Sequence, residues 1–322
     1  MAVYTKINNK QIKFIEKKYN IGKIINFSGI TKGIENTNFL LKTQKNKYIL
    51  TIYEKRVRKE DLPFFSKLML ELNKKNFICP KPIPNRDNNY ISSLDNKNFM
   101  IATYLEGKSK HSLSPNECGI VGKEIAKLHL ITKDFTFKRT NDLSVKSWRK
   151  IFTQVKDNCS KIHKDLPKLI EANLLNIEKD WPSNLPSGII HADLFNDNIF
   201  FKNNKFSGFI DFYFSCNDFF AFEIAICFNA LCFDGLKQNL SFNVTKAKKL
   251  MGGYNEVRKI SKEEKKSIKV LSQGAALRFL LTRVFDYINT VDDAVVKIKD
   301  PEEYLKRLEF HKNAKGFEDY LI

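Results

Sequence analysis

Long hydrophobic runs are absent from this sequence. The longest apolar stretch, residues 221–233, is interrupted by Glu223 and Asn229, and it is shorter than the roughly 20 apolar residues that cross a bilayer. The first residues lack the basic segment, the apolar stretch and the small-residue cleavage site of an export signal. We therefore expect no membrane partner and a cytoplasmic location.

Cysteine is sparse and never paired at short spacing. The six cysteines include no Cys-x-x-Cys motif, which argues against a zinc ribbon and a dithiol redox site. Cys227 and Cys232 lie within the apolar stretch, where cysteine commonly packs as a small hydrophobic residue. We expect reduced thiols, with these two in the core.

Acidic residues and arginines are both few relative to lysine. The chain has 55 Lys+Arg against 36 Asp+Glu, a net charge of +19 at pH 7, and clustered basic residues can bind nucleic acid. Only nine of the basic residues are arginines, and the lysines are scattered without an Arg-rich block or a nucleic-acid-binding motif. Solvated lysine faces explain the charge better, so we expect no nucleic-acid partner.

The chain does contain enough apolar material for a substantial core. Its 322 residues are 43% hydrophobic and 28% charged, which is typical of a folded protein and excludes wholesale disorder. This length suits one large or two medium-sized domains.

The first third of the chain alternates in the manner of a β-sheet. Residues 21–30, 39–43 and 48–53 are rich in aliphatic and aromatic side chains and are separated by turn-forming residues. This pattern predicts a three-stranded antiparallel meander. Further strands are expected near residues 90–94 and 99–105.

One helix is expected between these two groups of strands. Asp61 precedes Leu62 and Pro63, which predicts a capped helix start with proline in the first turn. Apolar residues then recur at helical spacing from Phe65 to Leu72.

Beyond residue 107 the pattern becomes mostly helical. Ser114, Pro115 and Glu117 form a capping box with proline at the first helical position. Further helical stretches are expected at residues 147–155, 168–179, 220–233, 261–288 and 301–311.

These elements predict an α+β, two-lobed fold. Residues 1–107 would form a small lobe with an antiparallel sheet and a helix, and residues 108–322 would form a larger, mainly helical lobe. A cleft between two such lobes is a natural place for a ligand.

The most informative segment is a polar loop followed by a short hairpin. His191, Asp193 and Asn198 precede the hairpin of residues 199–210, and Asp211 directly follows its second strand. Antiparallel pairing returns the side chains of Asp193, Asn198 and Asp211 to one edge. The spacing His-x-Asp-x-x-x-x-Asn, followed by an Asp at a strand end, is that of a kinase catalytic loop.

These residue types suit phosphoryl transfer from ATP. The reaction needs a carboxylate near the acceptor hydroxyl and oxygen ligands that hold Mg²⁺ against the nucleotide phosphates. We predict Asp193 as the catalytic base, Asn198 and Asp211 as Mg²⁺ ligands, and His191 as the residue that braces the loop. Each one alone could be an ordinary turn residue, but the four together at this spacing favour the functional interpretation.

Residues 29–38 occupy the place of a nucleotide-covering loop. They join two predicted strands early in the small lobe, where backbone amides can approach phosphates. Their glycine content is low, and an ordinary hairpin connection explains them equally well when they are taken alone. The interpretation gains weight only from the downstream loop.

The sequence resembles the aminoglycoside phosphotransferase and choline kinase superfamily, which has a protein-kinase-like fold, and within it the homoserine kinases of that fold. The resemblance extends over nearly the whole chain. The catalytic loop is typical of the superfamily. The likeness to the homoserine kinases rests on the segments at residues 1–5, 33–39, 50–56, 61–65, 210–218, 274–283 and 299–304.

This resemblance implies a reaction and its ligands. The implied reaction transfers the γ-phosphate of ATP, with Mg²⁺, to the side-chain hydroxyl of L-homoserine and gives O-phospho-L-homoserine for threonine biosynthesis. The nucleotide-binding residues that it implies are Gly33, Asn36, Thr37, Asn38 and Thr51. Many relatives carry Lys or Arg where this sequence has Thr51. The candidate replacements for that charge are Lys42, Lys55 and Arg56.

A homoserine pocket needs one group for each end of the zwitterion. A cation or amide donor would bind the carboxylate, and an acidic or carbonyl oxygen would bind the ammonium. The candidate cations are Arg139, Arg149, Arg278 and Arg283. The candidate anions are Asp218, Glu223 and Asp286.

Two other classes of function remain open from the sequence. One is a kinase of another small hydroxylated metabolite, such as choline, a sugar or an aminoglycoside. Choline lacks a carboxylate and calls for an aromatic cage, so an arginine in the pocket would favour an amino-acid acceptor. The other is a non-catalytic kinase-like binding module, against which the intact Asp193, Asn198 and Asp211 argue. The sequence predicts no particular oligomeric state.

Overall fold

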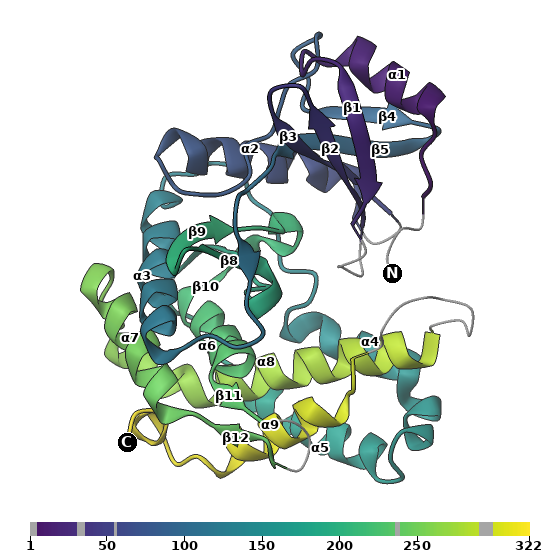
Figure 1. The fold of residues 1–322 in the computed structure, drawn as a ribbon. Coiled ribbons are helices and arrows are strands. Elements are labelled where there is room, and N and C mark those ends of the chain that lie inside the picture. Colours follow the sequence, from purple (N-terminus) through teal and green to yellow (C-terminus); the bar gives the residue numbers. More distant parts are fainter. Residues whose placement is uncertain (1–4, 31–35, 55–56, 236–238, 290–298) are drawn as a thin grey trace.

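The computed structural model describes residues 5–30, 36–54, 57–235, 239–289 and 299–322. They form a small part built on one β-sheet and a larger part made mostly of helices, which lie at opposite ends of the molecule (Figure 1). The expected α+β, two-lobed fold is thereby confirmed. The division at residue 107 stays a prediction. No helix in the described part of the chain is long and apolar enough to cross a membrane.

The small part is a five-stranded antiparallel sheet. Its strand order is β1-β2-β3-β5-β4. The bounds are β1 Ile24–Gly29, β2 Thr37–Thr43, β3 Lys47–Ile52, β4 Ile91–Leu94 and β5 Lys97–Thr103. The predicted meander is confirmed as β1, β2 and β3, and the two further predicted strands extend it. Within the β2–β3 hairpin, Asn38 pairs with Thr51, and Lys42 pairs with Lys47 at the turn end.

One face of this sheet is covered by α1 (Asn9–Lys18), a helix that the sequence pattern does not predict. The side chain of Asn8 caps its first turn by accepting backbone hydrogen bonds. Only Ile12 and Ile15 of the helix are buried, and they pack in one cluster with Leu50 of the sheet. The helix contains only one further apolar residue, the exposed Phe14, and three apolar residues in a short polar helix give too weak a periodicity to be recognised.

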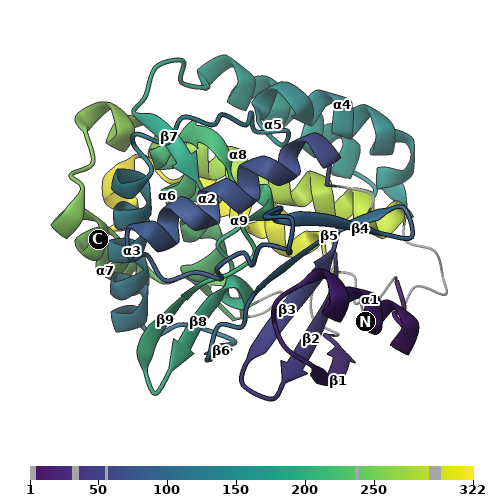
Figure 2. The ribbon, with the colours of Figure 1, turned by 90° about the horizontal axis from the view of Figure 1, so that it is seen from above.

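Helix α2 (Leu62–Lys74) lies between the sheet and helix α3 (Pro115–Ile131) (Figures 1 and 2). The predicted N-cap role of Asp61 is wrong. Its backbone is already helical and its side chain makes no capping hydrogen bond, whereas a capping residue normally has extended backbone. The Asp61 carboxylate instead accepts a hydrogen bond from Nε of Arg139 at 2.9 Å.

The larger part contains α3 and six further helices in the described residues. Their bounds are α4 Val145–Val155, α5 Leu166–Asp180, α6 Phe220–Leu231, α7 Val244–Val257, α8 Lys262–Asn289 and α9 Glu302–Asn313. All the predicted stretches are confirmed with small shifts of their ends, and the capping box of Ser114 and Glu117 begins α3 as expected. Helix α7, which packs against α3, is not predicted from the sequence.

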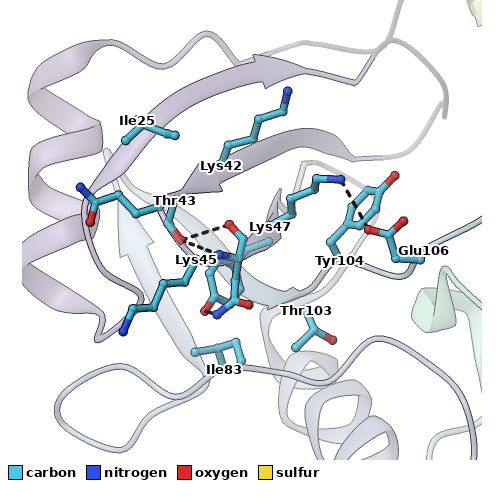
Figure 3. Close-up of a pocket in the computed structure, with 12 residues that line it drawn as sticks. Ile25, Lys42, Thr43, Lys45, Lys47, Ile83, Thr103, Tyr104 and Glu106 are labelled. Atoms are coloured by element: carbon cyan, nitrogen blue, oxygen red, sulfur yellow. Dashed lines mark hydrogen bonds and ion pairs between the residues drawn. The ribbon is translucent and has the colours of Figure 1, made fainter.

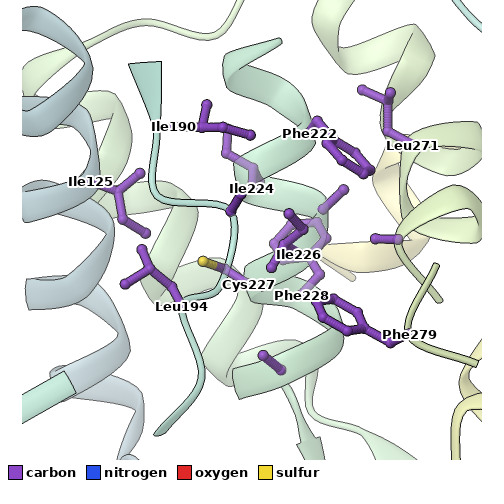
Figure 4. Packing of buried hydrophobic residues seen from close by; sticks show 14 of the residues in the cluster. Ile125, Ile190, Leu194, Phe222, Ile224, Ile226, Cys227, Phe228, Leu271 and Phe279 are labelled. Carbon is purple, nitrogen blue, oxygen red and sulfur yellow. The ribbon is translucent and has the colours of Figure 1, made fainter. Parts of the chain in front are cut away.

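Helix α6 is the centre of the core. Every one of its residues is buried, including Glu223 and Asn229. Figure 4 shows Cys227 on the side of Ile125 and Leu194, while Phe222 lies on the side of Leu271. The six cysteines of the chain are all buried and unpaired, so the expected thiols are confirmed, and Cys227 and Cys232 belong to the core as predicted.

Short strands hold both ends of the polar loop that follows residue 190. Strand β7 (Ser187–Ile190), which leads into the loop, pairs with β10 (Cys216–Phe219). The strands on the other side form a sheet of order β6-β8-β9, with β6 Lys108–Ser109, β8 Ile199–Lys202 and β9 Lys205–Phe209. Helix α6 ends earlier than expected because the chain continues as β11 (Phe233–Asp234), which pairs with β12 (Ser241–Phe242).

Candidate active site

The predicted hairpin brings Asp193, Asn198 and the residue before Asp211 together. Nδ2 of Asn198 donates to the backbone carbonyl of Asp193 at 2.8 Å and to its carboxylate at 3.1 Å. The backbone N–H of Ile210 donates to the carbonyl of Asn198 at 3.0 Å. The end of β9, and with it Asp211, is therefore fixed beside the loop that carries Asp193.

Two residues of this site adopt the left-handed backbone conformation that L-residues rarely take. Ala192, directly before Asp193, has a φ of 65°, and Asp211 has a φ of 64°. Such a conformation costs free energy and persists where neighbouring contacts enforce it. At Ala192 the enforcing contacts are hydrogen bonds to Glu223.

Glu223 of α6 holds the loop at Ala192. Its buried carboxylate accepts hydrogen bonds from the backbone N–H groups of His191 and Ala192, the latter at 3.1 Å. Burial raises the pKa of Glu223 to about 8, although the two backbone hydrogen bonds and the charge of Arg278 oppose the rise. From the sequence alone, Glu223 is only a candidate for binding the ammonium group of the acceptor. Its contact with Ala192 joins residues 31 positions apart, so no local pattern predicts it.

His191 lies inside the core, as its predicted bracing role requires. Its Nε2 donates to the carbonyl of Ile210 at 2.9 Å, and its ring packs against Phe212. Burial lowers the pKa of His191 to about 4, although its hydrogen bond to Ile210 opposes the shift. The imidazole is therefore neutral near pH 7 and ties the loop to the end of β9 without adding a charge.

Asp193 is partly exposed at the surface of this loop. Burial raises the pKa of its carboxyl, and the opposing influences are the charges of Arg278 and Lys299 and the hydrogen bond from Asn198. A raised pKa makes the carboxylate a better proton acceptor than an exposed aspartate would be.

The small part of the molecule meets this site through Tyr213. Its hydroxyl lies 3.4 Å from Oγ1 of Thr51, and its ring packs edge-on against Tyr53 and Phe65. Tyr213 comes two residues after Asp211, so the segment that carries Asp211 also contacts β3. Sequence reasoning does not single out Tyr213, because nothing in the local pattern marks it as a contact with the sheet.

The proposed nucleotide residues of the small part are close to one another. Oγ1 of Thr51 donates to Oδ1 of Asn38 at 2.7 Å. Thr37 donates to Glu54 at 2.7 Å, and the backbone N–H of Glu54 donates to Asn36 at 3.3 Å. Gly33, Lys55 and Arg56 lie outside the described residues.

Lys42 is the third candidate for supplying the positive charge that relatives carry at the position of Thr51. It lies at the turn end of the β2–β3 hairpin, away from Thr51. It lines a cavity of about 520 Å³ at the β2–β3 turn, together with Tyr104 and Glu106 of the segment after the sheet (Figure 3). An ion pair of 3.4 Å between Lys47 and Glu106 crosses this cavity. None of the loop residues from His191 to Asn198 lines it, so this cavity is separate from the predicted catalytic loop.

The candidate acceptor residues have other partners in the structure. Arg139 binds Asp61 and Asp142, and Arg149 binds Glu178 at 2.5 Å. Arg283 donates to Glu303 at 2.9 Å and to the carbonyl of Asp300 at 2.7 Å.

The candidate anion Asp218 accepts hydrogen bonds from Asn141 and from the backbone of Phe219, both at 2.7 Å. Burial raises the pKa of Asp218, and these two hydrogen bonds oppose the shift.

The fold, with the predicted catalytic loop between a sheet and a helical part, is that of a two-lobed kinase. Residues 26–241 match the model of the phosphotransferase enzyme family (APH), and the chain belongs to that family. The homoserine kinase of Mesorhizobium japonicum is 43% identical over 320 residues, which are 99% of each chain. That of Paramagnetospirillum magneticum is 42% identical over 328 residues, which cover both chains fully. The resemblance to homoserine kinases inferred from the sequence is thereby confirmed.

Solved structures show the same fold at low sequence identity. Amicoumacin kinase hAmiN, in complex with AMP-PNP, Ca²⁺ and Ami, has a TM-score of 0.71 at 10% identity, and the match covers 97% of this chain and 95% of that one. Choline kinase from Cryptosporidium parvum has a TM-score of 0.66 at 18% identity, with 94% of each chain covered. These likenesses establish the two-lobed kinase architecture.

Proposed function

We propose that this protein is a homoserine kinase that transfers the γ-phosphate of ATP to the side-chain hydroxyl of L-homoserine and gives O-phospho-L-homoserine for threonine biosynthesis. Identity of 42–43% to homoserine kinases along the whole chain supports the substrate. The observation that carries the chemistry is the hydrogen bond of 3.1 Å between Asn198 and the Asp193 carboxylate, beside the strand end that leads to Asp211.

Asp193 acts as the catalytic base in this proposal. Its carboxylate takes the proton of the acceptor hydroxyl as that oxygen attacks the γ-phosphorus, and ADP leaves with the electrons of the broken phosphoanhydride bond. The hydrogen bond from Asn198 fixes the direction of the carboxylate, and Glu223 and His191 fix the loop that carries it.

Asn198 and Asp211 would hold Mg²⁺. Because Nδ2 of Asn198 is used in binding Asp193, the amide oxygen is the atom that can face a cation. An amide oxygen and a carboxylate are suitable donors, since Mg²⁺ prefers oxygen ligands and usually takes only one or two protein carboxylates in addition to substrate phosphates. Within the described residues no cluster of three or more His, Cys, Asp or Glu could hold a metal on its own. When bound, the ion would neutralise charge on the β- and γ-phosphate oxygens.

The nucleotide is expected to lie between the sheet and the loop. We propose that Asn36, Thr37, Asn38 and Thr51 contact it, together with Gly33. The contact of Thr51 with Tyr213 supports this proposal, because Thr51 binds Asn38 and Tyr213 belongs to the segment that follows Asp211. Six buried cysteines without a disulfide agree with a cytoplasmic location.

A screen of ATP consumption tests this function. The purified protein is supplied with Mg²⁺, ATP and one acceptor at a time from homoserine, serine, threonine, choline and an aminoglycoside, and kcat/KM is measured for each. Homoserine should be the preferred acceptor, and Asp193→Asn should remove the turnover. Preference for another acceptor would contradict the substrate, and turnover that persists in Asp193→Asn would contradict the proposed base.

A further inference from the structure

Arg278 of α8 is a buried arginine with a donor that has no hydrogen-bond partner in the described structure. Only 1% of its surface is exposed. Nη1 donates to the carbonyl of Ala192 at 2.8 Å, whereas Nε is buried and has no partner among the described residues. A guanidinium carries five N–H donors, and buried donors are nearly always paired. An acceptor is therefore missing beside this side chain.

The missing acceptor would lie at the reacting centre. Arg278 contacts Ala192, the residue directly before Asp193. Burial raises the pKa of Asp193, and the charge of Arg278 is the largest influence that lowers it. Asp218 and Glu223 also interact electrostatically with Arg278, but neither carboxylate forms one of its hydrogen bonds in the described structure. Since Glu223 has a pKa of about 8, it carries little of the negative charge near Arg278 at neutral pH.

The other three candidate cations are already engaged. Arg139 is bound by two aspartates, Arg149 by Glu178, and Arg283 by Glu303 and a backbone carbonyl. Among these candidates in the described chain, Arg278 is the one with a buried, unpaired donor at the catalytic loop.

We propose that Arg278 binds the α-carboxylate of the amino-acid acceptor. The inference rests on the proposed function, because it takes homoserine as the acceptor. In homoserine three carbon atoms separate the hydroxyl from the carboxylate, a span of about 5 Å for an extended chain of bonds near 1.5 Å. A carboxylate on Arg278 thus leaves the hydroxyl within reach of Asp193, which is partly exposed and interacts electrostatically with Arg278.

The proposal also explains how the enzyme would select its acceptor. A ligand without a carboxylate would leave the donors of Arg278 unpaired, and a site built for a polar group rejects analogues that lack that group. Bidentate binding to a forked guanidinium adds direction to the charge. Asp193 and Arg278 would then fix the two ends of the same small molecule.

Two analogues separate the contributions of the two ends of homoserine. 3-Amino-1-propanol is homoserine without its carboxylate, and 4-hydroxybutyrate is homoserine without its amine. The wild-type enzyme is assayed for kcat/KM with homoserine and with both analogues, beside Arg278→Met and Arg278→Lys. The wild type should prefer homoserine over 3-amino-1-propanol by at least about 100-fold.

Arg278→Met also loses the hydrogen bond to Ala192, so kcat/KM should fall on both acceptors. It should fall at least about 20-fold further on homoserine than on 3-amino-1-propanol, so that the preference collapses. Arg278→Lys keeps the charge without the fork and should give an intermediate preference. Arg86→Met is the matched control, because Arg86 lies on the surface of the small part and donates to the backbone of Lys17. It should leave the preference unchanged.

Equal losses on both acceptors in Arg278→Met and in Arg278→Lys would overturn the proposal, because they would mean that Arg278 only holds the loop through Ala192. If Arg278→Met does not fold, the intermediate preference of Arg278→Lys decides the matter. A wild type inactive on homoserine would overturn the proposed function. In that case preference for 4-hydroxybutyrate over 3-amino-1-propanol would still support a carboxylate site, and the reverse preference would exclude it.

Discussion

Arg139 and Asp61 form an ion pair of 2.9 Å that joins the segment between α3 and α4 to the start of α2. Both side chains are largely buried, with 12% and 14% of their surfaces exposed. The same guanidinium also binds Asp142 and the carbonyl of Ser215. The pair therefore connects a helix next to the sheet with the segment that follows Asp211.

Removing either partner of this pair should destabilise the fold. Asp61→Ala and Arg139→Ala each leave a largely buried charge without its partner, and each should lower the free energy of unfolding by about 1–3 kcal/mol. Denaturant unfolding of both single variants and the double variant measures the coupling. Strict additivity of the two losses would contradict the importance of the pair.

Asp193→Asn should reduce kcat by about 10²–10⁴-fold, because the amide keeps the shape of the side chain and cannot accept the proton. Binding of ATP, measured by calorimetry, should be nearly unchanged. Asp197→Asn is the matched control, since Asp197 is in the same loop and its side chain is 74% exposed. Equal losses in the two variants would mean that the loop as a whole, and not the Asp193 carboxylate, is responsible.

Asp211→Ala should weaken the Mg²⁺-dependent binding of ATP. The variant loses a carboxylate ligand, so higher Mg²⁺ should be needed for half-maximal nucleotide binding. Titration of Mg²⁺ at fixed ATP measures this concentration, with Asp197→Ala as the control. An unchanged Mg²⁺ requirement would exclude Asp211 as a ligand.

Glu223 should make the stability of the protein depend on pH. In the unfolded chain its carboxyl titrates near the ordinary value of 4.5, and in the folded protein its pKa is about 8. Between these values the folded state keeps a proton that the unfolded state has released, so this contribution to stability is lost as the pH rises from about 4.5 to about 8.

Glu223→Gln cannot titrate and should not show this loss. The unfolding free energy of the wild type should therefore fall relative to that of the variant as the pH rises. Denaturant unfolding at pH 5, 7 and 9 gives the difference directly. A difference that is constant over this range would show that Glu223 keeps its ordinary pKa.

The contact between α3 and α7 should depend on a glycine. A Cβ atom at Gly122 of α3 would overlap the backbone carbonyl of Leu250 of α7, so Gly122→Ala should destabilise the protein by about 1–3 kcal/mol through overpacking. Gly252 of α7 has open space around it, and Gly252→Ala should instead stabilise it by about 0.5–1 kcal/mol. Thermal unfolding compares the two, and a gain in stability for Gly122→Ala would contradict the close contact.

The sequence predicts those helices and strands whose signals lie within a few neighbouring residues. The apolar residues of β1, β2 and β3 alternate on the scale of a strand, and the capping box at Ser114 marks the start of α3 within four residues. The hairpin after His191, Asp193 and Asn198 is predicted for the same reason, since its two strands and the turn lie in one short segment, and the catalytic role of these residues stays a prediction.

Features that depend on distant contacts are the ones that the sequence does not predict. Asp61 has the position of a helix cap, but a guanidinium 78 residues away binds its carboxylate. Glu223 appears in the sequence as one more residue of an apolar helix, and its contact with Ala192 exists only once α6 packs against the loop. Helix α7 is also missed: its buried Ala247, Leu250 and Tyr254 do recur at helical spacing, but the adjacent Gly252 and Gly253 disfavour a helix in the local sequence. Gly253 packs against the backbone of Gly119, a contact that only the folded structure shows.

The complete burial of α6 has a consequence for how acceptor preference could change. A side chain of α6 cannot be replaced without disturbing the support of the catalytic loop, because Glu223 belongs to the same helix as the core residues around it. Arg278 and Arg283 lie on α8, and their partners come from other segments. New acceptor specificities should therefore be sought at the partly exposed positions of α8 near Arg283 and in the segment before α4, while α6 is left intact in any library.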